Sequence, residues 1–424
     1  MGQQTLYNDL VVNGNLSFGG TTNNLSIGLS ALASNTTGFE NVALGDQALR
    51  NNTIGFDNVA LGLQALRNNI TGFNNVALGV KSLFSNTSGS NNVGVGSFGT
   101  LYFNTTGYNN VAVGSQGLHN NTTGDNNVAL GFQSLYSNTV GYNNVALGNQ
   151  SLFSNTSGYE NVAVGFQSLY YNLTGISNVA LGGISLYRNT GSNNVGVGRS
   201  TLYFNTSGTK NTALGDQALQ GSNSVSTDES TGLGYNAQVT GSKQVQLGGF
   251  GTTTYAHGAV QDRSDERDKA DIRDTVLGLD FISSLRPVDY KWDMREAYRV
   301  EAPTRVDKPS KLGDNASEEE ISNYNTKLAE YNAYTVELDQ WLESSKLANI
   351  THDGSKKRSR YHHGLIAQEV KTVLDQQGID FGGYQDHTIN GGDDVRSIGY
   401  TELIAPMIKA IQELKARIEE LENS

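Results

Sequence analysis

One short unit recurs along more than half of this chain at an almost constant spacing. Two of its clearest copies are Asn41-Val42-Ala43-Leu44-Gly45 and Asn58-Val59-Ala60-Leu61-Gly62. The asparagine that opens each copy returns every 17 residues, apart from 18 residues before Asn110 and 16 before Asn194. A fixed period of this length indicates a repeat architecture, in which each unit packs mainly against its two neighbours.

Each unit contains two apolar pieces separated by corners. Val42 and Leu44 are two residues apart and share one side of a strand, with Ala43 on the other side. Gly45 permits a corner, and the second piece, such as Ser134-Leu135-Tyr136, ends in an Asn-Thr-x-Gly turn. We expect Val and Leu to point inward. The 50 glycines and the hydrophobic content of 37% fit such a solenoid better than a compact α/β enzyme.

Seventeen residues are few for one coil, so the repeats predict a thin prism. One coil buries little surface alone, whereas stacked coils share a continuous core and close each other's edges. A thin prism gains most burial when three pack around an axis. The sequence therefore predicts a mainly β protein with a trimeric β-solenoid or β-prism shaft. The units resemble the left-handed β-roll repeats in the heads of trimeric autotransporter adhesins.

Charge and composition exclude several kinds of partner. Residues 1–263 carry 8 Lys/Arg against 10 Asp/Glu, and residues 264–424 carry 21 against 31, so the net charge of −12 lies mostly in the second part. Without a basic stripe we expect no nucleic-acid partner. The chain has no cysteine, and we expect no metal site and no cofactor. It shows no apolar run of membrane-spanning length and no secretory signal, which predicts release by lysis and no membrane insertion.

Changes in composition and local sequence pattern divide the chain into four segments. Residues 1–20 hold Asn13-Gly14 between two β-prone runs, which predicts a hairpin that either docks to a larger particle or caps the solenoid. Residues 21–248 form the shaft, whose period shortens near its end. Residues 249–263 form a connector. Residues 264–424 carry all four prolines and predict a mixed α+β domain.

Four segments of residues 264–424 have a clear local pattern. Residues 277–285 predict a helix, and residues 286–292 predict a strand. An insert, 296–358, contains a long polar helix over 317–347 that begins with a Ser317 and Glu320 capping box. Residues 402–422 predict a coiled coil. Its apolar residues follow a 3-4-3-4-3 spacing: Ile404, Met407, Ile411, Leu414, Ile418 and Leu421. This pattern alone would favour two strands.

Ser264 and Lys269 lie five residues apart and could act as nucleophile and base. On spacing alone, a capping serine and a solvated lysine would be the ordinary interpretation. Further motifs follow at Ile272, at Tyr290-Lys291-Trp292 and at residues 364–370. Together they resemble the intramolecular chaperone auto-processing domain, of the endosialidase type, found at the C-terminus of bacteriophage tail spikes and tail fibres.

This resemblance implies three chains and a self-cleavage that acts in cis. The cut would fall between Arg263 and Ser264, with Ser264 as nucleophile and Lys269 as base in its neutral form, which burial favours. His363 would assist. The chain departs from the family at Asp268, where an apolar residue is usual, and in the insert. An Asp268 carboxylate beside Lys269 would hold its positive charge and slow the reaction.

The resemblance also implies a role in host attachment. We expect a tail fibre of a virion, assembled in the host cytoplasm, with other tail proteins bound at its N-terminus and a host glycan or protein as receptor. Partly exposed aromatics follow the corner glycine in several repeats and could stack on sugars, or pack between coils or subunits: Phe56, Phe73, Tyr108, Tyr142 and Tyr159.

Two alternatives are a glycan-depolymerising tail spike and a bacterial trimeric surface adhesin. Depolymerisation needs paired carboxylates that face a groove. The acidic residues of the repeats are isolated, although Asp46 and Asp57 could approach each other on adjacent coils. We interpret them as solvated corner residues and expect no turnover enzyme. An adhesin would need a signal peptide and a membrane barrel, and the sequence shows neither.

Overall fold

The computed structural model describes residues 23–221, 226–249, 269–298, 317–390 and 394–423, with residues 252, 300, 303, 304, 306 and 309. The chain divides into two compact units. The solenoid unit holds the coils up to residue 221 and the segments 231–238 and 245–249. The C-terminal unit holds the chain from residue 269 onward together with the segments 226–230 and 239–244. The predicted hairpin at 1–20 lies outside the described residues.

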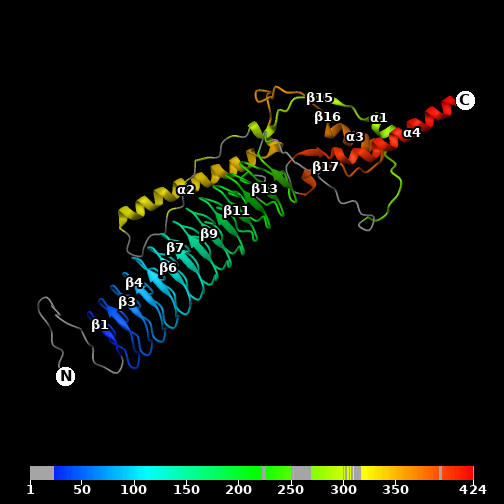
Figure 1. The fold of residues 1–424 in the computed structure, drawn as a ribbon. Coiled ribbons are helices and arrows are strands. Elements are labelled where there is room, and N and C mark those ends of the chain that lie inside the picture. Colours follow the sequence, from blue (N-terminus) through cyan, green and yellow to red (C-terminus); the bar gives the residue numbers. More distant parts are fainter. Residues whose placement is uncertain are drawn as a thin grey trace, which may run out of the picture. The chain divides into compact units, whose positions relative to one another are not determined.

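The solenoid unit is built around a parallel sheet of fourteen strands in sequence order, and strands from both ends of this series are labelled in Figure 1. Each strand has three residues and pairs in register with the equivalent strand of the next coil, as in Val42↔Val59, Ala43↔Ala60 and Leu44↔Leu61. The predicted mainly β fold, a solenoid of 17-residue repeats, is confirmed. The strands are β1 (Leu25–Ile27), β2 (Val42–Leu44), β3 (Val59–Leu61), β4 (Val76–Leu78), β5 (Val93–Val95), β6 (Val111–Val113), β7 (Val128–Leu130), β8 (Val145–Leu147), β9 (Val162–Val164), β10 (Val179–Leu181), β11 (Val195–Val197), β12 (Thr212–Leu214), β13 (Thr231–Leu233) and β14 (Val245–Leu247).

Left-handed backbone conformations turn the chain at fixed points of each coil. Gly45 has φ 135°, and a Cβ atom there would collide with the carbonyl of Gly62 on the next coil. Residues other than glycine are also left-handed, including Leu49 at φ 48°, a conformation that L-residues rarely adopt. The amide of Leu49 donates to the carbonyl of Ala65 at 3.0 Å. Hydrogen bonds between coils thus hold the strained residues in place, and they explain why proline is absent from the repeats.

The interior of the solenoid differs from our expectation. Ala60 is 0% exposed, whereas Leu61 is 37% exposed and Val59 is only half-buried. The prediction that Val and Leu point inward is therefore wrong within one chain. The reason is the narrow lumen, which a fully buried leucine from the second piece of most coils already fills. A Cβ atom at Gly94, in the alanine column, would lie 3.5 Å from Leu83 Cγ, so only a small residue fits opposite that leucine.

Two ladders of buried asparagines complete the interior. In the first ladder, Oδ1 of Asn41 accepts hydrogen bonds from the backbone amide of Asn58 at 3.1 Å and from its Nδ2 at 3.0 Å. Nδ2 of Asn58 also donates to the carbonyl of Gly72. In the second ladder, Nδ2 of Asn69 donates to Oδ1 of Asn52 and to the carbonyl of Gly72. Most of these polar groups find a partner on their own or the next coil, so the asparagines stay buried at little cost, whereas Oδ1 of Asn172 and Oδ1 of Asn205 are buried without a hydrogen-bond partner.

The C-terminal unit has short strands and four α-helices among its described residues. Strand β15 pairs antiparallel with β16, and β17 pairs antiparallel with β18. The elements are α1 (Leu279–Ser284), β15 (Val288–Tyr290), η3 (Arg295–Tyr298), α2 (Glu318–Ser344), η4 (Leu347–Asn349), β16 (His362–Gly364), α3 (Ala367–Gln377), β17 (Tyr384–Asp386), η5 (His387–Asn390), β18 (Arg396–Ile398), η6 (Tyr400–Leu403) and α4 (Ile404–Glu422). Its core is one cluster of buried side chains: Leu277, Phe281, Val370, Leu374, Phe381 and Leu403.

The local predictions for this unit hold in position. A helix and a strand lie within 277–285 and 286–292, each shorter than predicted. The long helix α2 begins at the predicted capping box, where Ser317 Oγ accepts from the Glu320 amide and the Glu320 carboxylate accepts from the Ser317 amide. Helix α4 covers most of 402–422, and the apolar residues of its predicted seam are exposed in the single chain, whereas Pro406 and Ala410 are buried.

Candidate functional site

The predicted cleavage segment lies at the margin of the described residues. Arg263, Ser264 and Asp268 fall outside them, and Lys269 is the first residue described after the gap, with an exposed side chain. The spacing between the Ser264 hydroxyl and the Lys269 amine therefore stays a prediction.

His363 has a partner that the sequence analysis missed. It lies on β16 directly opposite Asp289 of β15, and its Nδ1 is 2.5 Å from Asp289 Oδ1. A carboxylate that accepts the Nδ1 proton fixes the tautomer and leaves Nε2 able to take up a proton, as a general base requires. Both side chains are largely exposed. The pairing follows from strand register and could not be found without it.

Aromatic rings and a backbone contact fix the antiparallel pair of β15 and β16. Tyr290 packs edge-on against Trp292, with ring centroids 5.1 Å apart. The amide of Leu365 donates to Tyr400 Oη at 2.9 Å. A Cβ atom at Gly364 would collide with that hydroxyl, which explains the glycine in the second motif. Burial raises the pKa of Tyr290, as does nearby Tyr400, so its hydroxyl stays neutral at physiological pH.

Most of the aromatics that follow the corner glycine stack between coils, whereas Tyr108 has Ser90 and Asp125 at the equivalent positions of its two neighbouring coils. Phe56 lies between Phe39 and Phe73, with ring centroids 4.9 Å apart on both sides. Tyr142 stacks on Tyr159 at 4.7 Å. Of the two interpretations we considered, packing between coils is observed. Several rings remain exposed at their edges: Phe39, Phe73, Tyr108 and Tyr142 are 36–46% exposed. Stacking on sugars stays a prediction.

A second aromatic ladder was not predicted. It joins eight rings on successive coils, each with its neighbours at 4.9–5.3 Å: Phe84, Tyr102, His119, Tyr136, Phe153, Tyr170, Tyr187 and Tyr203. His119 replaces a phenyl ring within it and contacts the carbonyl of Gly99 through Nδ1 at 2.8 Å. Burial lowers the pKa of His119, an effect that this hydrogen bond partly opposes. The 17-residue spacing of these aromatics was the signal that could have revealed the ladder.

The acidic residues of the repeats do not pair as we considered. Asp57 lies before β3 and Asp46 lies after β2, so they sit at opposite ends of these paired strands. Asp57 instead follows Glu40 in one exposed column, since its amide donates to the carbonyl of Phe39 on the preceding coil. Among the described residues, no group of three acidic or histidine side chains could hold a metal ion.

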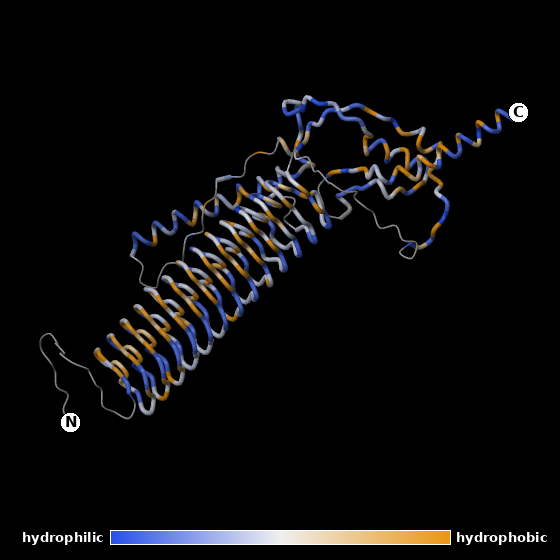
Figure 2. The backbone as a smooth tube through the Cα atoms, in the orientation of Figure 1, coloured by the Kyte–Doolittle hydropathy of each residue, from blue (hydrophilic) through white to orange (hydrophobic). Residues whose placement is uncertain are grey.

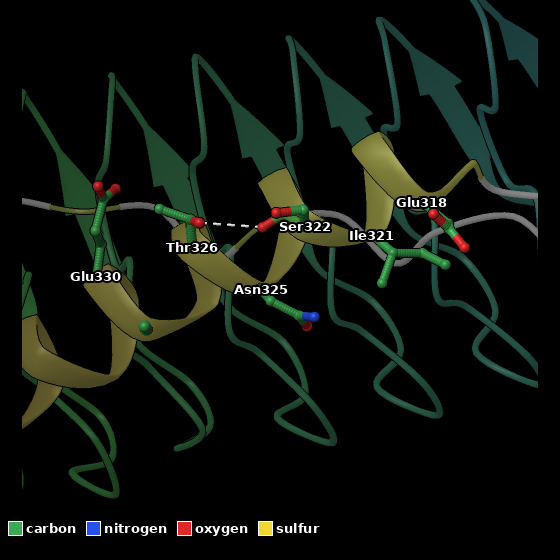
Figure 3. A pocket seen from close by; sticks show the side chains of 7 residues that line it. Glu318, Ile321, Ser322, Asn325, Thr326 and Glu330 are labelled. Atoms are coloured by element: carbon green, nitrogen blue, oxygen red, sulfur yellow. Dashed lines mark hydrogen bonds between the residues drawn. The ribbon is translucent and has the colours of Figure 1, made fainter.

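A shallow hollow of about 700 Å³ lies beside α2. Figure 3 shows the side chains that line it, which come from this helix, and Thr326 Oγ1 donates to the carbonyl of Ser322 at 3.0 Å. Its two carboxylates, Glu318 and Glu330, are separated by about 18 Å along the helix, because each residue adds about 1.5 Å. They are too far apart to act on one bond, so we do not place a catalytic site there.

No helix in the described part of the chain is long and apolar enough to cross a membrane.

A comparison with protein families matches the segment that begins at the predicted cleavage site. The model of a peptidase family, described as the chaperone of endosialidase, matches residues 264–308. The matched segment begins at Ser264 and includes α1, β15 and Asp289. No curated protein and no solved structure matches the chain. The chain thus combines a β-solenoid with a segment similar to the endosialidase chaperone, as in a fibre that carries its own chaperone.

Proposed function

We propose that this chain forms the shaft of a homotrimeric tail fibre of a bacteriophage, and that its C-terminal region is an intramolecular chaperone removed by self-cleavage between Arg263 and Ser264. The observation that carries this proposal is the position of the family match. It begins at Ser264, shortly after the last solenoid strand ends at Leu247. A solenoid joined to this chaperone segment is the arrangement expected of a fibre.

The uniformity of the solenoid explains why its assembly would need a chaperone that sets the register between chains. Each described strand pairs with the next through the same three positions, so a chain displaced by one coil along another would find nearly the same contacts. Register errors are frequent when repeated segments look alike. A C-terminal region that associates first would align three chains before the shafts assemble. The match to a chaperone family supports formation of a trimer.

The cleavage chemistry is an acyl shift followed by hydrolysis. Ser264 Oγ attacks the carbonyl carbon of Arg263, and Lys269 takes the hydroxyl proton and delivers it to the departing Ser264 nitrogen. The peptide C–N bond breaks and an ester forms, which water hydrolyses to free the Arg263 carboxylate. His363, oriented by Asp289, assists by accepting a proton from that water. Burial of Lys269 between assembled chains would favour its neutral form and make cleavage report correct assembly.

Mass spectrometry of the purified protein tests this proposal. The wild-type chain should yield two fragments that meet at Arg263 and Ser264. Ser264→Ala and Lys269→Ala should each leave the full chain of 45.5 kDa, still trimeric by light scattering. If the wild-type chain stays whole after folding, Asp268→Leu should restore cleavage. Cleavage that persists in Ser264→Ala would rule out the mechanism.

We place host attachment on the exposed rings of the solenoid. The ladder of Phe39, Phe56 and Phe73 offers parallel rings spaced 4.9 Å apart, and aromatic faces and edges are common contacts for sugar rings and apolar receptor surfaces. Residues 1–20 would bind other tail proteins. Replacing Phe39 and Phe73 by alanine should weaken adsorption of the fibre to host cells, whereas Thr123→Ala, on an exposed corner, should not. Equal adsorption by both variants would move the receptor site elsewhere.

A further inference from the structure

The outer face of the fourteen-stranded sheet is an uncharged and almost entirely apolar surface. The first and third residues of each strand point outward, because the middle residue of nearly every strand points into the lumen. Fourteen strands offer 28 such positions, and all of them are Val, Leu or Ile except Thr212 and Thr231. None carries a charge, and none is fully buried: Leu130 is 38% and Val113 is 40% exposed. Figure 2 shows apolar and polar columns running along the solenoid.

The column of aromatic residues after the corner glycine lacks this continuity. The rings after the corner glycine are interrupted by Ser90, Asp125 and Ser192, which occupy the equivalent positions of their coils. Asp125 carries a charge and accepts a hydrogen bond from the amide of Tyr108. The second aromatic ladder begins only at Phe84, since Arg50 and Arg67 occupy the equivalent positions of the two preceding coils. Of these three columns, only the outward positions of β1 to β14 cover the full length of the solenoid without a charge. We call the 28 outward positions of β1 to β14 the strand face.

We propose that the strand face packs against the strand faces of two further copies of this chain, which assigns the surface through which the shaft trimerises. This inference rests on the homotrimer of the proposed function and specifies its interface. A partner must repeat at the same rise as the solenoid, about 4.8 Å per coil, if it is to contact every strand. A second copy of the chain has this rise by necessity.

The size of the face is sufficient for a stable contact. Thirteen steps between strands give a length of about 62 Å, and three residues give a width of about 10 Å. Two such faces bury about 1,200 Å² together, above the ~1,000 Å² that a specific interface requires. A face without charge also suits contact between identical surfaces, since like charges would otherwise meet across the symmetry axis.

Helix α4 independently points to the same occupant. The residues of its predicted seam are 43–75% exposed, although they are Ile, Met or Leu. An apolar heptad stripe is covered when equivalent helices of identical chains pack together. Both units of the chain thus leave one long apolar stripe uncovered, and identical copies would cover both.

Cysteine cross-linking in the full-length protein tests the assignment, because the natural chain has no cysteine. Leu130→Cys and Leu147→Cys, on the strand face, should give covalent dimers with a short bis-maleimide. Thr123→Cys, exposed on a corner between β6 and β7, is the matched control and should give at least tenfold less. A protein that is trimeric by light scattering but links through Thr123→Cys and not through Leu130→Cys overturns the assignment alone. A monomeric wild-type protein overturns the proposed trimer as well.

A charge on the strand face gives a second measurement. Leu130→Asp with Leu147→Asp would place six carboxylates near the axis of a trimer, and the trimeric fraction should fall at least tenfold relative to Thr123→Asp. The outward direction of both side chains means that each chain keeps its own lumen, so the β signal in circular dichroism should persist. A trimer unaffected by this double substitution would place the interface on another face.

Discussion

In the solenoid unit, each coil buries almost the same few side chains, whereas the C-terminal unit buries one cluster drawn from distant segments. A typical coil contributes one alanine, one leucine and two asparagines, all within contact of their equivalents one coil away. The C-terminal cluster joins Phe281 of α1 to Leu374 of α3 and to Leu403. It has no repeat, so each of its members has a different set of neighbours.

This difference suits the two units to different roles, because only the C-terminal unit can define how identical chains align. Contacts between neighbouring coils stabilise the solenoid locally but do not distinguish one coil from the next, so they carry no information about alignment between chains. A core without repeats has one register only. A chain whose long part cannot define its own alignment gains from a non-repetitive part that can, and the following predictions test how far this contrast holds.

Removing residues 264–424 should have the largest effect. Without the non-repetitive part, three shafts would meet in many registers, so the truncated chain should be recovered as monomer or aggregate. Size-exclusion chromatography with light scattering measures this, with full-length Ser264→Ala as the matched control that keeps the C-terminal region attached. A soluble trimer formed by the truncated chain would show that the shaft aligns itself.

Large-to-small substitutions in the core should reduce amide protection over different distances in the two units. Phe281 is 1% exposed, and Phe281→Ala should destabilise the C-terminal unit by about 3–5 kcal/mol, with loss of amide protection throughout its core. Leu135 is 0% exposed, and Leu135→Ala should cost about 2–5 kcal/mol. Its effect should stay within the coils nearest β7, because each coil contacts only its neighbours. Hydrogen exchange resolves the two patterns. Protection lost along the whole solenoid in Leu135→Ala would contradict the local character of its packing.

The sequence alone was enough for the path of the solenoid but not for its interior. The 17-residue period located the strands, and alternation showed that Val59 and Leu61 share a side opposite Ala60. Alternation does not say which side faces the lumen, since that depends on the space left by Leu66 of the same coil. Likewise, the motif residues pointed to His363, but its pairing with Asp289 depends on the register of two strands 74 residues apart.

The smallest predicted effect concerns the one histidine in the long aromatic ladder. His119 stacks on Tyr102 and Tyr136 at 5.3 and 5.2 Å, and burial lowers its pKa below the ordinary value of 6.5. Below about pH 6.5 the unfolded chain therefore binds a proton that the folded chain resists, so the stability present above that pH is lost progressively on acidification. His119→Phe keeps the stacked ring and removes the titrating group.

Melting temperatures measured between pH 8 and pH 5 test the contribution of His119 to this loss of stability. Both proteins should lose stability on acidification, because burial also lowers the pKa of His387, which the substitution leaves in place. The loss should be smaller in His119→Phe, and at pH 8 the variant should lack only the contact to the Gly99 carbonyl, worth about 0.5–1.5 kcal/mol. Equal slopes in the two proteins would mean that His119 takes up its proton as readily inside the ladder as in the unfolded chain. The repeated packing of the solenoid would then tolerate a buried charge at one coil.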